Sequence, residues 1–189
     1  MKICSILLVV IIFSNSAWAE AQGIDDAKIA VYFAPGDGCT AAIAKAIDGA
    51  TSSIRVLAYH LTSPRICKAI VDAQKRGLSV EVILDHTQNT KKYSSADFLL
   101  HEEVSVRIDN AHTIAHNKVI VIDDKIVVTG SFNFTSSAET KNAENLLIIE
   151  SPKLAAAYLE NYAKLRKEST TYQEKDAKID ALPPEKEAP

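Results

Sequence analysis

The strongest constraint on the fold is a regular alternation of short apolar runs with segments of helical periodicity. Apolar runs of strand length lie at 29–33, 54–59 and 80–85. Between the first two, residues 40–50 place apolar side chains on one helical face. Between the second and third, a helix is predicted to begin after Ser63, with Pro64 at its first position, and to end at Gly77. This alternation predicts an α/β domain whose first half is largely parallel.

The second half of the chain predicts a return to neighbouring strands. Strands are expected at 104–108, 118–122, 126–129 and 146–149. The middle two are separated only by Asp123-Asp124-Lys125, which indicates a hairpin. Helices are expected at 96–101 and after Ser151-Pro152, where Leu154 and Tyr158 begin an apolar row. The polar segment 86–95 is expected to be an exposed loop.

Both ends of the chain differ from its middle. Met1-Lys2 is followed by an apolar run at 3–13 and by Ala17-Trp18-Ala19, a signal-peptide pattern with a small-residue cleavage site. The run is too short to span a bilayer comfortably. We therefore expect residues 1–19 to be removed and the mature chain to be periplasmic or secreted, without stable membrane insertion; an uncleaved anchor is the alternative. Residues 174–189 are charged and poor in apolar side chains, which indicates a disordered tail.

The net charge limits the class of function, and the cysteines leave their own redox state undecided. The formal net charge is −3, and loss of Lys2 with the signal peptide would make it −4. This mild acidity argues against binding nucleic acid over the whole surface but permits a local basic cleft. Cys39 and Cys67 remain after the signal peptide is lost. In an oxidising compartment they form either a disulfide or two buried thiols, and the sequence leaves both open.

Two polar residues, His116 and Lys118, stand at the start of an otherwise apolar strand. Alternate residues of a strand share a face, so both side chains are expected to point the same way. Asp123 has the opposite parity and lies at the strand end. We therefore expect Asp123 to have a structural or orienting role rather than to contact the same ligand.

The hairpin register decides which groups face His116 and Lys118. With a two-residue loop, Lys118 lies opposite Ser131, and His116 lies opposite Asn133; a three-residue loop shifts the register by one. In the first register an imidazole, an ammonium, a hydroxyl and an amide meet on one face, a set suited to a phosphate group. His116 would supply a nucleophile or a proton carrier. A solvated strand edge is the alternative.

The pattern His116-x-Lys118-x4-Asp123, followed by Gly130-Ser131-Phe132-Asn133-Phe134-Thr135, resembles the phospholipase D superfamily. It most resembles the small secreted bacterial nucleases of that superfamily, which carry one such motif per chain. The resemblance extends to Tyr32-Phe33-x-Pro35, Ala58-Tyr59-x-Leu61-Thr62-Ser63-Pro64 and Lys75-Arg76-Gly77. It implies that residues 20–173 form a phosphodiesterase domain, a mixed β-sheet flanked by helices on both faces. Because two motifs make one active site, it also implies a homodimer whose site straddles the twofold axis.

The resemblance further implies a mechanism. His116 of one subunit attacks phosphorus and forms a phosphohistidine, and His116 of the other protonates the leaving oxygen. Lys118, Ser131 and Asn133 are expected to bind the phosphate. Glu144 corresponds to the family acid that orients the histidine, and the expected catalytic set is completed by Asp123.

No pattern in the sequence indicates a bound metal or another cofactor. His112-x3-His116 is the one tempting ligand pair, but it leads into a strand rather than lying on a helix. The resemblance, the short chain with a single motif and the secretion signal make DNA or RNA the expected substrate, cut by a non-specific endonuclease that needs no metal. Hydrolysis of phosphatidylcholine-type lipids by a phospholipase D is the alternative, and a binding module without catalysis is a third reading. Lys91, Lys92 and Lys141 either line a path for the nucleic-acid backbone or are solvated surface lysines.

Overall fold

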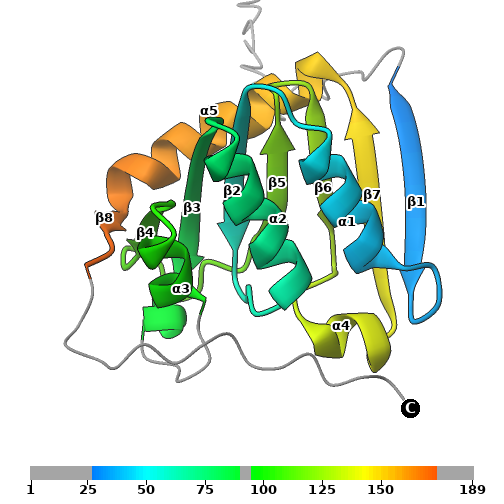
Figure 1. Ribbon diagram of the computed structural model, residues 1–189, viewed down its shortest axis with the longest axis horizontal. Coiled ribbons are helices and arrows are strands. Elements are labelled where there is room, and N and C mark those ends of the chain that lie inside the picture. The colour runs from blue at the N-terminus through cyan, green and yellow to red at the C-terminus, as the bar shows by residue number, and fades with distance from the viewer. Residues whose placement is uncertain (1–26, 90–94, 174–189) are drawn as a thin grey trace, which may run out of the picture.

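The computed structural model describes residues 27–89 and 95–173, and their centre is one eight-stranded sheet (Figure 1). The strands are β1 (Lys28–Ala34), β2 (Ser53–Ala58), β3 (Ser79–Asp85), β4 (Ser105–Asp109), β5 (Lys118–Ile122), β6 (Ile126–Gly130), β7 (Glu144–Glu150) and β8 (Thr170–Thr171). The helices are α1 (Cys39–Asp48), α2 (Pro64–Lys75), the 3-10 helix η1 (His86–Asn89), α3 (Ala96–His101), α4 (Ser136–Thr140) and α5 (Pro152–Glu168).

The strand order is β1-β7-β6-β5-β2-β3-β4-β8. Strands β2, β3 and β4 are parallel neighbours, as their alternation with helices predicts. The other pairs, from β2–β5 through β5–β6 and β6–β7 to β7–β1, are antiparallel, and so is β4–β8. The mixed sheet is therefore confirmed, but β1 stands at the far edge beside β7 instead of joining the parallel group.

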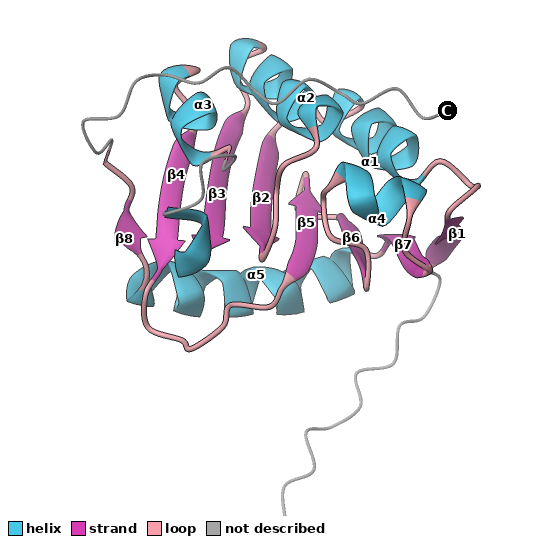
Figure 2. Ribbon diagram, turned by 90° about the horizontal axis from the view of Figure 1, so that it is seen from below, coloured by secondary structure: helices cyan, strands magenta, loops and turns pink. Residues whose placement is uncertain are grey.

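Helices cover both faces of the sheet, as expected (Figure 2). Helices α1 to α4 lie on one side, where Ile43 and Ile70 belong to the main core with Val56 and Ile120. Helix α5 crosses the other side, over a smaller core of alternate strand residues. Because successive strand residues point to opposite faces, the apolar runs of β2, β3 and β5 supply both cores at once.

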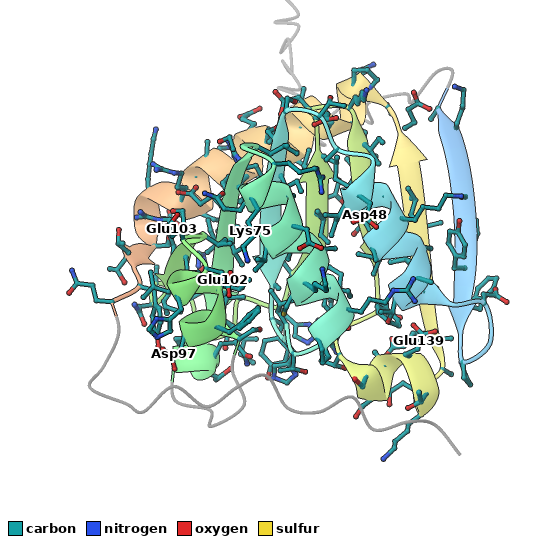
Figure 3. The ribbon with its side chains drawn as sticks, viewed as in Figure 1. Asp48, Lys75, Asp97, Glu102, Glu103 and Glu139 are labelled. Carbon is teal, nitrogen blue, oxygen red and sulfur yellow. The ribbon has the colours of Figure 1, made fainter. Side chains whose placement is uncertain are left out.

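The short helix α4 is fastened to the start of α1. Glu139 lies on α4 (Figure 3), and its carboxylate accepts a hydrogen bond from the Thr40 backbone N–H at 2.7 Å. A carboxylate is favourable at this position because the first N–H groups of a helix have no partner within the helix. On the opposite side of the same layer, Lys75 of α2 forms an ion pair of 2.6 Å with Glu102 at the end of α3.

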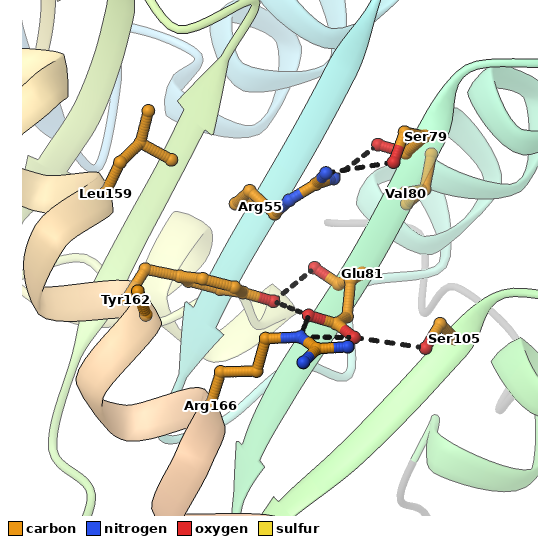
Figure 4. A pocket seen from close by; sticks show the side chains of 9 residues that line it. Arg55, Ser79, Val80, Glu81, Ser105, Leu159, Tyr162 and Arg166 are labelled. Carbon is orange, nitrogen blue, oxygen red and sulfur yellow. Dashed lines mark hydrogen bonds and ion pairs between the residues drawn. The ribbon is translucent and has the colours of Figure 1, made fainter.

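Helix α5 is held to the sheet by the buried carboxylate of Glu81 on β3 (Figure 4). Tyr162 donates its hydroxyl to Glu81 Oε2 at 2.9 Å, and Arg166 donates Nε to the same oxygen at 2.8 Å. Burial raises the pKa of Glu81, but hydrogen bonds from Arg166 and Tyr162 outweigh this and lower it. The carboxylate therefore stays charged and fixes the direction in which α5 crosses the strands. Beside it, Arg55 donates to the Ser79 carbonyl and hydroxyl.

Several local expectations are confirmed and others need correction. Helix α2 has Pro64 in its first turn and ends just before Gly77, whose φ is +86°. The start of α5 is capped as predicted, because the Ser151 hydroxyl accepts the Leu154 N–H at 3.2 Å. Helix α4 and strand β8 were not predicted. In the expected loop, His86 to Asn89 form a 3-10 helix whose Gln88 is buried.

The two cysteines left open by the sequence are free thiols, and both are buried. The expected signal peptide and the charged tail lie outside the described residues. Within residues 27–89 and 95–173, no helix has both the length and the apolar character needed to cross a membrane.

Candidate active site

The candidate site forms where the end of β2 meets the start of β5. These strands run antiparallel with Ala58 opposite Lys118, so the chain after β2 passes beside the chain before β5. The Tyr59 N–H donates to the Asn117 carbonyl at 2.8 Å, which extends the pairing by one bond beyond the strands. As a result, the ring of Tyr59 is brought next to His116.

Tyr59 contacts both polar residues of the motif. Its ring centre lies 4.6 Å from that of His116 in an edge-on arrangement. The ammonium of Lys118 lies over the same ring, 5.2 Å from its centre. Tyr59 also stacks on His60, with the two ring centres 4.1 Å apart. The structure thus adds Tyr59 to the site; the sequence marked this residue only as the end of an apolar run and as part of the segment Ala58-Tyr59-x-Leu61 that carries the resemblance.

His116 and Lys118 differ sharply in exposure although they are two residues apart. His116 is exposed, whereas Lys118 is only 8% exposed. The Lys118 ammonium donates to the His116 carbonyl at 3.1 Å. Burial lowers the pKa of Lys118, and the nearby carboxylate of Glu144 opposes that shift. The site therefore presents an accessible imidazole next to a partly desolvated positive charge. Such a charge stabilises an anionic group more strongly than a fully hydrated charge does.

The expected hairpin register is wrong. Ile122 pairs with Ile126, and the pairing continues to Val119 opposite Thr129, so the loop has three residues rather than two. Asp123 leaves the ladder because its N–H donates to the Ser53 carbonyl at 2.9 Å. Consequently Ser131 and Asn133 do not stand opposite Lys118 and His116 as the two-residue loop would require.

Ser131 reaches the site by a different route, through β7. Gly130 has a φ of +152° and lies against the Asn145 carbonyl, so closely that an added Cβ would lie 2.3 Å from that oxygen. The backbone N–H of Ser131 then donates to the same carbonyl at 3.1 Å. The Ser131 hydroxyl donates to Glu144 Oε2 at 2.5 Å. The Ser131 hydroxyl is thus bound to the carboxylate that opposes the lowering of the Lys118 pKa, and Lys118, Ser131 and Glu144 are called the polar cluster below.

The structure does not show the contacts that were expected of Glu144 and Asn133. The hydrogen bonds of Glu144 within the described chain go to Ser131 and, at 2.9 Å, to Asn142. They do not include His116, the group that Glu144 was expected to orient. Asn133 lies on the loop after Ser131, and among the described residues its buried Oδ1 has no hydrogen-bond partner.

Asp123 does not join the polar cluster. It follows the last residue of β5, about 16 Å along the strand from Lys118 at roughly 3.3 Å per residue. Its carboxylate accepts the backbone N–H groups of Thr51, Ser52 and Ser53 at 2.8–3.1 Å. Placing Asp123 in the catalytic set is therefore corrected, because these contacts fit its expected structural role.

The metal ligand pair considered from the sequence is spread along a loop. His112 Nδ1 lies 3.0 Å from Asp109 Oδ2, and its Nε2 lies 3.9 Å from Glu168 Oε2, so both ring nitrogens face carboxylates. Among the described residues, no three His, Cys, Asp or Glu side chains are gathered as a metal site requires.

Comparison with known proteins places this site in a family. Residues 43–166 match the family model described as "Cardiolipin synthase, PLD-like domain". The chain belongs to the phospholipase D superfamily. The matched range contains His116, Lys118, Ser131 and Glu144, so His116 and the whole polar cluster lie within the shared domain. As a member of this superfamily, the chain is a phosphodiesterase.

Individual relatives agree on the superfamily and differ in name. A protein of Rickettsia bellii named "Phospholipase D" is 45% identical over 135 residues, 71% of this chain and 67% of that protein. The mouse "Mitochondrial cardiolipin hydrolase" is 30% identical over 66% of this chain and 56% of its own length. Among solved structures, the phospholipase D family member Nuc of Salmonella typhimurium is 38% identical with a TM-score of 0.75, covering 79% of this chain and 100% of that one.

Proposed function

We propose that this phosphodiesterase is a non-specific endonuclease for DNA or RNA that works without a metal and uses His116 as its nucleophile. The observation that carries the proposal is the exposed His116 ring beside the buried ammonium of Lys118. A nucleophile must be reachable by a bulky polymer, whereas the charge that stabilises the transition state works best where water is partly excluded. The match to Nuc over the whole of that chain supports a nuclease of the same size.

The proposed reaction has two steps. The neutral imidazole of one His116 attacks phosphorus, and the bond to the leaving oxygen breaks as that oxygen takes a proton from a second, protonated His116. In the second step the now neutral imidazole removes a proton from water, whose oxygen attacks phosphorus and releases the first His116. Lys118 is proposed to stabilise the negative oxygens, joined by the Ser131 hydroxyl once its hydrogen turns from Glu144 to the phosphate. Because the two rings must differ in protonation, the rate should follow a bell-shaped pH profile.

Since each chain carries the motif once, this reaction needs two chains, and we propose a twofold homodimer. An apolar surface on the edge strand is available for such a contact: Ile29, Val31 and Phe33 are 57%, 51% and 58% exposed on one face of β1. Phe33 pairs with Asn145, whereas Ala34, on the other face of β1, pairs with Glu144, so this surface lies across the sheet from the Glu144 side chain. A second copy placed there would cover the apolar side chains.

The dimer can be tested by mixing subunits. Chains carrying His116→Ala are unfolded and refolded with an excess of wild-type chains, or the reverse, and activity is measured per wild-type chain. The proposal predicts that heterodimers have little activity, so activity per wild-type chain falls as the variant is added. Full activity per wild-type chain would contradict a shared site.

A second candidate is hydrolysis of a phospholipid. Two observations favour it: relatives 42–45% identical are named "Phospholipase D", and Ile114, two residues before His116, is 56% exposed. An exposed apolar side chain beside the nucleophile suits a lipid better than a nucleic acid. The chemistry of His116 and Lys118 would be the same, because the reacting group is again a phosphodiester.

One experiment separates the candidates. The mature protein is incubated with plasmid DNA, RNA or phosphatidylcholine vesicles in the presence of EDTA, with His116→Ala as the control. The endonuclease proposal predicts nicked nucleic acid that the control does not produce. Released choline without nicking would favour the lipid candidate, and EDTA inhibition would contradict a reaction without metal.

We also propose that residues 1–19 direct export to the periplasm or the medium. The support is their sequence pattern alone. N-terminal sequencing of the exported protein should find a chain that begins at or near Glu20.

A further inference from the structure

We propose that Asp85, at the end of β3, is a positioning residue that holds the backbone of the loop carrying His116. The inference rests on the proposed role of His116 as nucleophile. It concerns the segment between β4 and β5, which the resemblance to known nucleases leaves without an assigned function apart from His116 itself.

Asp85 belongs to a pair of buried carboxylates. Strands β3 and β4 are parallel, and Asp85 pairs in register with Asp109 at their shared end. The two residues are 0% and 1% exposed. Two buried carboxylates side by side are costly unless each is hydrogen-bonded, so their partners show what they do in the fold.

The partners of Asp85 lead directly to the nucleophile. Its Oδ2 accepts the backbone N–H of Ala115, the residue before His116, at 2.7 Å. Its Oδ1 accepts the Thr87 N–H at 2.9 Å and the Thr87 hydroxyl at 2.5 Å. Burial raises the pKa of Asp85, but these bonds and the nearby His86 outweigh it and lower the pKa. The carboxylate is therefore charged, and its bond to Ala115 is a strong, charge-assisted one.

This bond matters because little else fixes His116 in place. The His116 side chain is exposed, and its described ring contact is the edge of Tyr59. Before it, residues 111–114 are all exposed. The backbone is tied on both sides of His116: by Asp85 to Ala115, and by Tyr59 to Asn117 at 2.8 Å. In addition, Lys118 donates to the His116 carbonyl at 3.1 Å. Loss of the Asp85 bond would therefore free the chain before His116 and leave it held by the bonds of Asn117 and Lys118.

Asp109 supplies a matched control within the same loop. It is equally buried, but it accepts the N–H groups of Ala111 and His112 at 3.0 and 3.1 Å and binds the His112 ring. Its contacts therefore lie four or five residues before His116. Asp109→Asn should disturb the beginning of the loop to a similar degree without releasing Ala115.

The experiment compares full mature proteins carrying Asp85→Asn or Asp109→Asn, well below their unfolding temperatures. By NMR, the Ala115 amide should be shifted downfield and protected from hydrogen exchange in the wild type and in Asp109→Asn. In Asp85→Asn we expect its protection to fall about tenfold or more. Cleavage kcat should fall on the order of 10–100-fold with KM nearly unchanged, because a displacement of about 1 Å is enough for such a loss. Asp109→Asn should lower kcat less than about fivefold.

Each other outcome has a defined meaning. If Asp85→Asn loses Ala115 protection but keeps kcat, or if both variants lower kcat equally, Asp85 is not a positioning residue. If Asp85→Asn does not fold, Asp85→Glu keeps the charge but displaces the carboxylate by one methylene, and the same two measurements apply to it. Activity in His116→Ala would overturn the proposed nucleophile instead, while the Ala115 result would still report on the hydrogen bond.

Discussion

Replacing Asp123 by asparagine tests whether the third residue of the motif supports the fold or takes part in chemistry. Its carboxylate accepts three backbone N–H groups, from Thr51, Ser52 and Ser53, and two hydroxyl groups. Asparagine keeps the shape and one acceptor oxygen, and it tolerates the φ of +53° found here. What it removes is the negative charge and the second acceptor.

The expected cost follows from these bonds. A hydrogen bond to a charged group contributes about 1.5–3 kcal/mol, and a neutral one about 0.5–1.5 kcal/mol. Each of the three backbone bonds should therefore weaken by about 1 kcal/mol. Because Thr51 and Ser52 are exposed, water replaces part of the loss, and we expect the free energy of unfolding to fall by about 2–3 kcal/mol. This corresponds to a Tm lower by roughly 4–12 °C.

The pH dependence of this difference has a definite sign. Burial raises the pKa of Asp123, but hydrogen bonds from Ser53, Thr51 and Ser52 outweigh it and hold the pKa far below the usual range. A carboxyl group with a lowered folded pKa stabilises the fold above its unfolded pKa, near about 3.9. That contribution is lost as the pH falls towards the folded value. The difference between the wild type and Asp123→Asn should thus be complete at pH 7 and shrink below about pH 4.

Urea unfolding followed by circular dichroism measures the difference, and Asp124→Asn is the matched control. Asp124 also has a positive φ, +56°, but it is exposed and accepts one hydroxyl, from Ser53 at 3.2 Å. Its replacement should cost less than about 0.5 kcal/mol. The folded Asp123→Asn protein should keep its cleavage kcat. A kcat lowered on the order of 10³-fold with unchanged stability would refute the structural role.

Three further predictions concern the site and the attachment of α5. Lys118→Met should lower the single-turnover cleavage rate on the order of 10³-fold or more, because it removes the buried positive charge. An unchanged rate would show that Lys118 does not stabilise the transition state. Tyr59→Leu should lower kcat about tenfold or more, because the ring of Tyr59 contacts His116. Tyr59→Phe keeps the ring and should stay near the wild type. Equal losses of kcat in both variants would show that the hydroxyl group matters instead. Tyr162→Phe should lower the free energy of unfolding by about 1–2 kcal/mol, because the Glu81 carboxylate loses a hydrogen-bond donor. It should leave kcat unchanged. A lower kcat would show that the attachment of α5 affects the active site.

Most helices and strands of this fold could be predicted from short stretches of the sequence. The apolar runs at β2, β3 and β5 and the Pro64 and Gly77 boundaries of α2 were predictable because strand and helix periodicity act over a few residues. The two-residue β8 and the short α4 carry too little periodicity to be recognised. The edge position of β1 is equally hidden, since it depends on its pairing with β7, which lies more than 100 residues away.

Some features of the site could likewise be predicted from the sequence, and others depend on the tertiary structure. The sequence by itself determined that Lys118 begins a strand and that Asp123 follows its end, because the apolar run between them is a local pattern. His116 lies two residues before that strand, so strand alternation does not fix its side chain. The tertiary structure decided the hairpin register, because Asp123 is bound by the distant segment 51–53 rather than by its own hairpin. It also brought Tyr59 to His116 and Asp85 to the loop before it. Those contacts join strand ends that are neighbours only in the assembled sheet, so no local pattern could reveal them.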